Sequence, residues 1–268
     1  MAIPKNHKTQ PIKPDAGYAG ISKVGQVGDE HLRQFLDYGK GIGSQLGYET
    51  ILPGKLDENG FVERCKQPGG FVALAPVKGE KRSTEKVNAD YNGDWSKLLD
   101  IARATIAVDS VEEIHQVLDK MRANGVEFAK QPKDRITTPP DQTGYRDIMT
   151  NVVMPNGCVC EIQVHLKPML IAKAQGHHQY EVMRSISAKC SLEKRDMSPE
   201  EQKTYDQMLA ESQKIYGDAW KQCTGESNSI KPRLEKAAKY AKRHTDAKGQ
   251  KDLFTGEVRA QKEKQRVS

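Results

Sequence analysis

The sequence predicts a mixed α/β (α+β) fold, in which helices pack on a mixed sheet of about five strands. Segments with strand and helix character alternate along the chain, which is typical of a sheet covered by helices. In addition, Asn156-Gly157 lies between two apolar stretches, and this pair is the strongest short signal for a β-hairpin. The 268 residues suffice for one sizeable domain with extensions, or for two small domains.

Apolar periodicity and capping residues predict the elements of the first half. Ser110 followed by Glu113 forms the pattern of a capping box, and Gly125 marks the end of the helix that follows it. In order, we expect a helix over 29–47, a strand over 70–77, a helix over 83–91, a strand over 99–108, a helix over 110–125 and a strand over 126–131.

The second half contains the hairpin and two further helices. The last helix is expected to begin after Ser198, because Pro199 favours a first helical turn and Glu201 stands three residues after the cap. The preceding elements are a loop over 132–143, the hairpin over 144–165 and a helix over about 168–189.

The second strand of the hairpin carries a carboxylate in an apolar setting. Because side chains alternate along a strand, Glu161, Gln163 and His165 share one face. The opposite face carries Cys158, Cys160, Ile162 and Val164. An unpaired carboxylate is costly to bury, so Glu161 is a candidate for metal or proton chemistry.

Composition divides the chain into three parts. Residues 1–28 lack periodicity and predict a flexible lead-in, residues 29–225 a central domain with its core over 70–190, and residues 226–268 a basic extension. Residues 229–268 contain twelve Lys/Arg and five Asp/Glu, a charge of +7, whereas the whole chain has +6, so the rest is near −1. The extension is either a solvated tail or a segment that attracts phosphates or nucleic acid.

Several classes of protein do not fit the sequence. No apolar run approaches the roughly 18 residues of a membrane span, and the N-terminus lacks the apolar centre of a secretory signal. The five cysteines form no disulfide framework, and Cys158 and Cys160 fit core packing better than zinc ligation. Neither common glycine-rich phosphate loop is present.

Charged residues at regular spacing form the first candidate site. Lys78, Arg82 and Lys86 are four residues apart, which places three cations on one face where a strand runs into a helix. Such a group is either a solvated basic face or a cradle for polyphosphate.

Two carboxylates form the second candidate site. If Asp100 and Glu161 lie on neighbouring strands, they can share Mg²⁺, which prefers oxygen ligands and bridges phosphates. Strand alternation would place Arg103 and Thr105 on the face opposite Asp100. A third candidate is Tyr145, which is flanked by cations and can stack on a base.

Read in order, these segments resemble the synthetase domain of the RelA/SpoT family, the alarmone (ppGpp-type) synthetases. The resemblance covers about residues 70–185, and looks like a divergent, toxin-like branch of small synthetases without a hydrolase domain. It rests on the order and spacing of Lys78…Lys86, Asp100-Ile-Ala, Lys133-Asp134-x-Ile136…Pro139, Gly144-Tyr145-Arg146, Glu161-Ile162-Gln163, His177-His178 and Tyr180.

The resemblance implies a nucleotidyltransferase-like fold and a Mg²⁺-dependent pyrophosphokinase, with residues 29–225 as its catalytic domain. It implies that Asp100 and Glu161 hold the metal and that Glu161 also deprotonates the attacking hydroxyl. For ATP as donor, the implied binding residues are Lys78, Arg82, Lys86 and Arg103. For the acceptor, they are Lys133, Tyr145, Arg146, Gln163, His165 and His177.

The sequence departs from the family pattern at three recognition positions, one of which is Pro76, in the place of a second stacking Arg. Thr105 stands where the family has an Arg that stacks on the donor adenine, and Met149 replaces an acceptor-site His. Guanine or adenine nucleotides are therefore both open as acceptors, giving (p)ppGpp- or (p)ppApp-type products. Two alternatives are pyrophosphorylation of the tRNA 3′-CCA end and a catalytically inactive nucleotide-binding module.

A synthetase without its own hydrolase would drain ATP, so the resemblance further implies a growth-inhibiting toxin or effector. Its site of action would be the cytoplasm, reached by secretion or by delivery without a classical signal peptide. Its expected partners are ATP, the acceptor nucleotide or tRNA, and a neutralising antitoxin or immunity protein, with no membrane.

Overall fold

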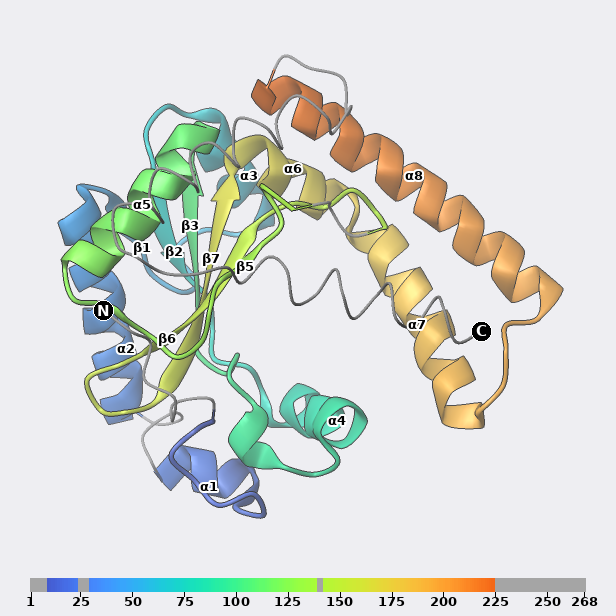
Figure 1. Ribbon diagram of the computed structural model, residues 1–268, viewed down its shortest axis with the longest axis horizontal. Coiled ribbons are helices and arrows are strands. Elements are labelled where there is room, and N and C mark those ends of the chain that lie inside the picture. The colour runs from blue at the N-terminus through green and yellow to red at the C-terminus, as the bar shows by residue number, and fades with distance from the viewer. Residues whose placement is uncertain (1–8, 24–28, 139–141, 225–268) are drawn as a thin grey trace, which may run out of the picture. The chain divides into compact units, whose positions relative to one another are not determined.

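Seven strands form one mixed sheet in the part of the chain that this computed structural model describes, residues 9–23, 29–138 and 142–224 (Figure 1). The predicted α/β class is confirmed, with two strands more than expected. The additional strands, β1 (Glu49–Ile51) and β5 (Lys133–Asp134), are too short to show alternation in the sequence. The predicted basic extension over 226–268 lies outside the described residues.

The sheet places β7 at its centre. Its order is β1-β2-β3-β7-β6-β4, and β5 also pairs with β6. β7 pairs in parallel with β3 and antiparallel with β6, so both of its edges are hydrogen-bonded. The remaining strands are β2 (Phe71–Leu74), β3 (Arg103–Val108), β4 (Glu127–Phe128), β6 (Ile148–Val153) and β7 (Val159–Leu166).

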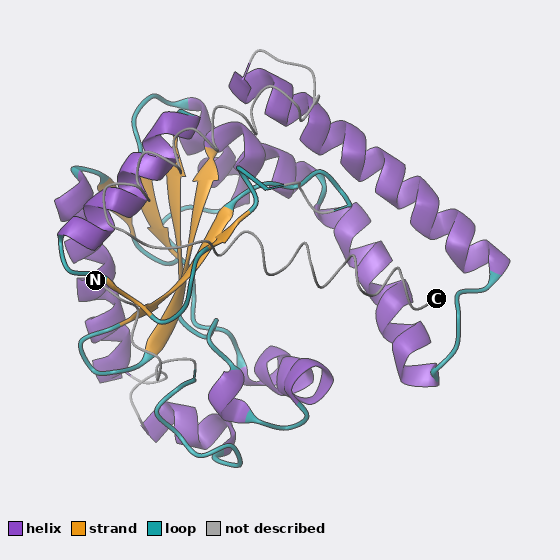
Figure 2. Cartoon of the chain, in the orientation of Figure 1, coloured by secondary structure: helices purple, strands orange, loops and turns teal. Residues whose placement is uncertain are grey.

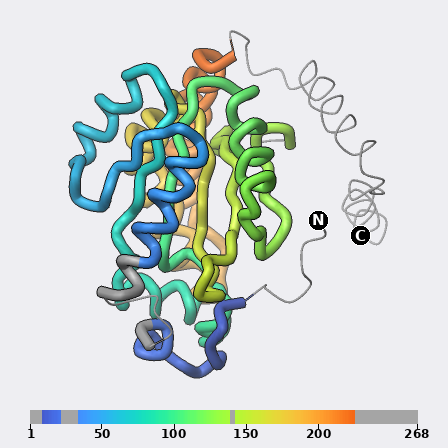
Figure 3. The backbone as a smooth tube through the Cα atoms, turned by 90° about the vertical axis from the view of Figure 1, so that its left-hand side faces the viewer, coloured from blue at the N-terminus to red at the C-terminus, as the bar shows by residue number. Residues whose placement is uncertain are grey.

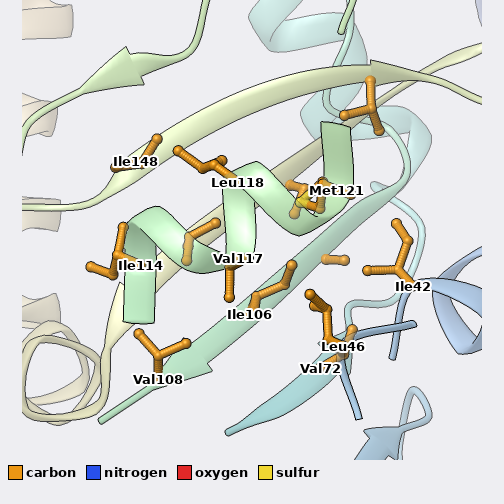
Figure 4. Packing of buried hydrophobic residues seen from close by; sticks show 14 of the residues in the cluster. Ile42, Leu46, Val72, Ile106, Val108, Ile114, Val117, Leu118, Met121 and Ile148 are labelled. Atoms are coloured by element: carbon orange, nitrogen blue, oxygen red, sulfur yellow. The ribbon is translucent and has the colours of Figure 1, made fainter. Parts of the chain in front are cut away.

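One face of the sheet is covered by α2 (Asp29–Leu46) and α5 (Val111–Ala123), which lie in front of the strands in Figure 3. The apolar stripe of α5, including Ile114 and Met121, packs on the even-numbered side chains of β3 (Figure 4). Ser110 caps α5 as predicted, by accepting a hydrogen bond from Glu113 N at 3.2 Å. The Glu113 carboxylate instead reaches Asp109 N, at 2.9 Å.

The opposite face is covered only in part. The helices α3 (Glu58–Lys66) and α6 (Lys167–Gln175) pack over Phe71 and Ala107 at one end of this face. The pair α7 (His177–Glu193) and α8 (Pro199–Thr224) then runs away from the sheet (Figures 1 and 2). This arrangement leaves the middle of the face to the polar side chains of β3 and β7.

The single helix predicted over 168–189 is two helices, α6 and α7, which meet at Gly176. A Cβ atom at Gly176 would lie 3.4 Å from the Tyr216 hydroxyl and 3.3 Å from the Ala172 carbonyl oxygen. The tighter of these two contacts is to the backbone of α6, so a larger residue here would require a small shift between α6 and its neighbour. Ser198 begins α8 with the predicted capping box, since Ser198 N donates to the Glu201 carboxylate at 2.9 Å and Glu201 N donates to Ser198 Oγ at 3.2 Å.

The N-terminal segment differs from the flexible lead-in that its composition predicts. Within the described residues 9–23 it forms α1 (Gly17–Lys23), and Gln10 is 2% exposed. The Gln10 amide accepts from Val159 N at 3.0 Å and donates to Val159 O and Leu98 O at 2.9 Å. One buried amide thus pairs with the start of β7 as a neighbouring strand would, which holds the segment in place.

The remaining helices of the described chain are α4 (Glu80–Tyr91) and the short 3₁₀ helix at Trp95–Lys97. They precede β3 and carry part of the candidate site. Among the described residues, no helix combines the length and the apolar character that crossing a bilayer requires.

Candidate active site

Asp100 is held by two lysines that come from different segments. It lies in the turn between the 3₁₀ helix and β3 and is 8% exposed. Lys78 and Lys86 both donate to its Oδ2 atom, Lys86 at 2.8 Å. The other oxygen, Oδ1, is buried and has no hydrogen-bond partner. One lone-pair-bearing oxygen therefore remains open to a further cation.

Glu161 lies at the centre of the sheet, on the face that the described helices cover only in part. In the strand register it is opposite Arg103 on β3 and Asn151 on β6. Its Oε1 accepts a hydrogen bond from Gln163 Nε2 at 2.8 Å. The alternation predicted for β7 is confirmed, because Cys160, Ile162 and Val164 are buried in the core against α5 whereas Glu161 and Gln163 are half-buried.

The pKa values of the two carboxyl groups are shifted in opposite directions. Burial raises the pKa of Glu161, and the negative charge of Asp100 raises it further. Burial alone would also raise the pKa of Asp100, but hydrogen bonds from Lys78 and Lys86 outweigh it and lower the pKa. Asp100 is thus stabilised as an anion, whereas Glu161 is the more basic of the two and better suited to accept a proton.

Strand alternation predicted Asp100 on the opposite side from Arg103, and this was wrong. The strand begins at Arg103, so residues 98–102 turn instead of alternating. The turn brings Asp100 into electrostatic contact with Glu161.

A chain of polar contacts continues from Glu161 through neighbouring side chains. Gln163 Oε1 lies 3.1 Å from His165 Nε2, and His165 Nδ1 lies 3.5 Å from the Tyr145 hydroxyl. That hydroxyl donates to Asp147 Oδ2 at 3.0 Å, and Asp147 Oδ1 pairs with Arg135 at 2.8 Å. Burial lowers the pKa of His165 well below its usual value, and the charges of Lys173 and Arg135 lower it further, so the ring is neutral.

A cavity of about 690 Å³ opens beside this chain, between the sheet and the helices α7 and α8. Tyr145, Gln163, Lys173, His177 and Tyr180 contribute to its lining. The Tyr145 ring lies 5.5 Å from the Arg135 guanidinium and 5.6 Å from the Lys173 ammonium, and the edge of Tyr216 meets it at 5.4 Å between centroids. A ring held in this way is a rigid wall of an aromatic and cationic cavity.

The structure brings together most of the predicted site residues. Lys78, Lys86 and Asp100 meet, and Arg103 lies opposite Glu161. Lys133 is opposite Met149, which is opposite Gln163, so these three share the face of Glu161. The cavity joins Tyr145, Gln163 and His177.

Three predicted residues lie elsewhere. Arg82 is half-exposed and pairs with Glu85 at 3.0 Å, away from Asp100. His165 is fully buried, so the predicted contact with an acceptor is not available to it, and its ring lies beside Gln163 and Tyr145. The Arg146 guanidinium is turned inward, where it donates to the carbonyl oxygens of Arg135, Ile136 and Thr138 and stacks on Trp220 at 4.3 Å.

We expect Arg146→Met to destabilise the protein by about 1–3 kcal/mol, because the substitution leaves one buried and two partly buried carbonyl groups without their donor. Urea unfolding followed by circular dichroism measures this change, with the exposed Arg122→Met as the control. Once folded, the variant should bind acceptor as the wild type does. Unchanged stability together with weaker acceptor binding would instead return Arg146 to the phosphate-binding role.

The residues present fit a magnesium ion. The described residues contain no group of three or more His, Cys, Asp or Glu side chains that could hold a metal by themselves. Mg²⁺ commonly uses only one or two carboxylates and takes its other ligands from water and substrate phosphates. Asp100, with its buried and unpartnered Oδ1, and Glu161 match that requirement.

Sequence reasoning missed Lys130, Lys173 and Arg184. Lys173 and Arg184 line the cavity, and the charge of Lys130 interacts with Glu161 and Asp100. None of them carries a local signal, because their positions depend on where α6, α7 and the end of β4 pack. Lys173 lies on the helix after β7, so the sequence does not show that its ammonium contacts Gln163 Oε1, at 3.2 Å.

Two carboxylates that interact electrostatically, a group of cations and a cavity with aromatic rings thus lie together on a mixed sheet. The chain is similar to the (p)ppApp synthetase toxin Tas1 of Pseudomonas aeruginosa (strain UCBPP-PA14), with 28% identity over 183 residues. The matched region is 59% of this chain and 37% of Tas1, so the chain spans little more than a third of that relative's length. This similarity confirms the resemblance to alarmone synthetases. No known family model matches the sequence.

The chain is also similar to two solved structures. The type VI effector Tas1, in complex with its immunity protein, has a TM-score of 0.47 and 22% identity, covering 76% of this chain and 97% of that chain. The small alarmone synthetase 1 from Bacillus subtilis has a TM-score of 0.44 and 16% identity, covering 80% of this chain and 96% of that chain.

Proposed function

We propose that the protein transfers the β,γ-pyrophosphate of ATP to the ribose 3′-hydroxyl of a nucleotide and releases AMP. The observation that carries this proposal is the arrangement of Asp100, bound by Lys78 and Lys86, next to the more basic Glu161 and the nucleotide-sized cavity. The sequence similarity to a (p)ppApp synthetase supports it.

Each side of the site has its own task in this reaction. Lys78 and Lys86 would bind the ATP phosphates, and Arg103 would contact the donor nucleotide from β3. Glu161 would remove the proton of the 3′-hydroxyl, whose oxygen then forms a bond to the β-phosphorus while the bond to the α-phosphate oxygen breaks. Mg²⁺ on Asp100 and Glu161 would neutralise charge on the transferred group.

We propose an adenine nucleotide as the acceptor and a toxic outcome in bacteria. Met149 faces the site beside Gln163 and Lys133 and provides no hydrogen bond to a guanine edge. The name of the relative, a (p)ppApp synthetase toxin, supports both choices. Such an activity would consume ATP in the cytoplasm, so the producing cell would need a neutralising partner.

Purified protein with ATP and Mg²⁺ is expected to release AMP, and ATP alone can support this release because ATP is itself an adenine nucleotide with a free 3′-hydroxyl. Anion-exchange separation of the products after incubation of α-phosphate-labelled ATP with AMP, ADP, GDP, GTP or tRNA identifies the acceptor, and one labelled AMP should appear for each pyrophosphorylated product. If AMP is released only in the presence of tRNA, then tRNA and not a nucleotide is the acceptor. Absence of AMP with every acceptor would favour a binding module.

Expression of the wild-type chain is expected to stop bacterial growth, because ATP is drained faster than it is replaced. Viable counts and extracted nucleotide pools measure the effect after induction. Cells that express Lys86→Met at the same level should keep growing, since the ATP phosphates lose a cation. Normal growth with the wild-type chain would contradict the toxin role.

A further inference from the structure

The cavity beside Glu161 is built for an anion that carries an aromatic ring. Its lining includes the cations Arg135, Lys173 and Arg184 and the rings of Tyr145, Tyr180 and Tyr216, and no lining residue is a carboxylate. Cations that line a cavity attract phosphate, and tyrosine rings stack on bases. Under the proposed function this cavity takes the acceptor.

The three cations differ in their existing partners. Arg135 is bound to Asp147 at 2.8 Å, and Arg184 to Glu181 at 2.7 Å. Among the described residues, Lys173 has no carboxylate partner within ion-pair distance, and its ammonium donates only to the neutral Gln163 Oε1, at 3.2 Å. An ammonium donates three hydrogen bonds, so Lys173 keeps donors for a ligand.

Lys173 also occupies a specific place between two parts of the site. Its ammonium lies 5.6 Å from the centre of the Tyr145 ring, and the Gln163 side chain that it contacts is bonded to Glu161 at 2.8 Å. Lys78 and Lys86 gather instead on Asp100, before β3, whereas Lys173 comes from α6 after β7. Lys173 is therefore on the acceptor side of the base.

We propose that Lys173 binds the 5′-phosphate of the acceptor and thereby selects nucleotides over nucleosides. This proposal rests on the proposed function, since it names the group that reads the acceptor in the same site. Arg146, which the sequence placed near those phosphates, is committed to backbone carbonyl groups.

The test compares acceptors with and without a 5′-phosphate, in proteins with and without the Lys173 ammonium. Wild-type protein and Lys173→Met are compared at saturating ATP with AMP and with adenosine as acceptors, and with GMP and guanosine. We expect the substitution to lower kcat/KM about 10- to 100-fold for the monophosphates, the range for one hydrogen bond to a charged group. Nucleosides should be used equally by both proteins, and KM for ATP should stay within twofold.

Two further variants act as controls. Lys173→Arg keeps the positive charge and should retain most of the preference for monophosphates. Lys214→Met removes an exposed lysine of α8 that does not line this cavity, and should change nothing. An equal loss with nucleosides and nucleotides, or no loss with either, would overturn the role of Lys173.

A binding experiment tests the role of Lys173 independently of the proposed reaction. Isothermal titration of AMP and adenosine into wild-type and Lys173→Met protein, each saturated with a non-hydrolysable ATP analogue, needs no turnover. Weaker AMP binding by Lys173→Met with unchanged adenosine binding supports the lysine even if no acceptor yields product. Equal AMP affinities of the two proteins overturn it even if the wild type is an active synthetase.

Discussion

Glu161→Gln is expected to lower kcat about 10²- to 10⁴-fold, the usual contribution of a general base. Glutamine has nearly the same shape, and its carbonyl oxygen can still accept the hydrogen bond from Gln163 Nε2. The substitution therefore removes proton acceptance and one metal ligand without disturbing β7. Release of labelled AMP under single-turnover conditions measures the loss, with the exposed Glu112→Gln as the matched control.

The pH dependence and the stability of this variant provide independent checks. Only ionised Glu161 accepts a proton, so kcat/KM of the wild type should rise with pH through the raised pKa of this carboxyl. A raised pKa in the folded state means that ionisation of Glu161 opposes folding as pH rises through that pKa. Glu161→Gln should thus melt at the same or a higher temperature near neutral pH, and lose this advantage below pH 4.5, the ordinary pKa of Glu. Full activity, or a lower melting temperature at neutral pH, would contradict the assignment.

Asp100→Asn is expected to lower kcat about 10²- to 10³-fold, as the loss of a group that organises charge at a reacting centre commonly does. The carboxylate holds Lys78 and Lys86 together, and its free Oδ1 is the proposed metal ligand. In its absence two ammonium groups repel each other, and the metal keeps only Glu161. Titration with Mn²⁺ in the presence of a non-hydrolysable ATP analogue should show weaker metal binding.

Asp90→Asn is the matched control for Asp100, because it removes the same charge from an exposed position on α4. Its kcat should remain within twofold of the wild type. Asp100→Asn that binds Mn²⁺ as tightly as the wild type would exclude Asp100 as a ligand, whatever its activity.

The sequence predicted most of the sheet because its signals are local. Alternation on β7, the Asn156-Gly157 pair and the caps at Ser110 and Ser198 depend on neighbouring residues only. The hairpin is confirmed, although the five residues 154–158 separate its strands, with Gly157 in the left-handed region at φ 82°. The features that the sequence did not predict involve residues that are far apart along the chain. The turn that redirects Asp100, the inward rotation of Arg146 and the approach of Lys173 to Gln163 all depend on packing between distant segments.

The central position of β7 has a consequence for how this site can evolve. Glu161 sits on a strand that is paired along both edges, whereas Lys78 and Lys86 come from the region before β3 and Lys173 from a helix after β7. Substitutions on one flank leave the other flank and the shared base in place. Under the proposed function, substitutions in α6, α7 and position 149 would change the choice of acceptor while the residues for ATP stay the same, so that one scaffold could serve synthetases with different products.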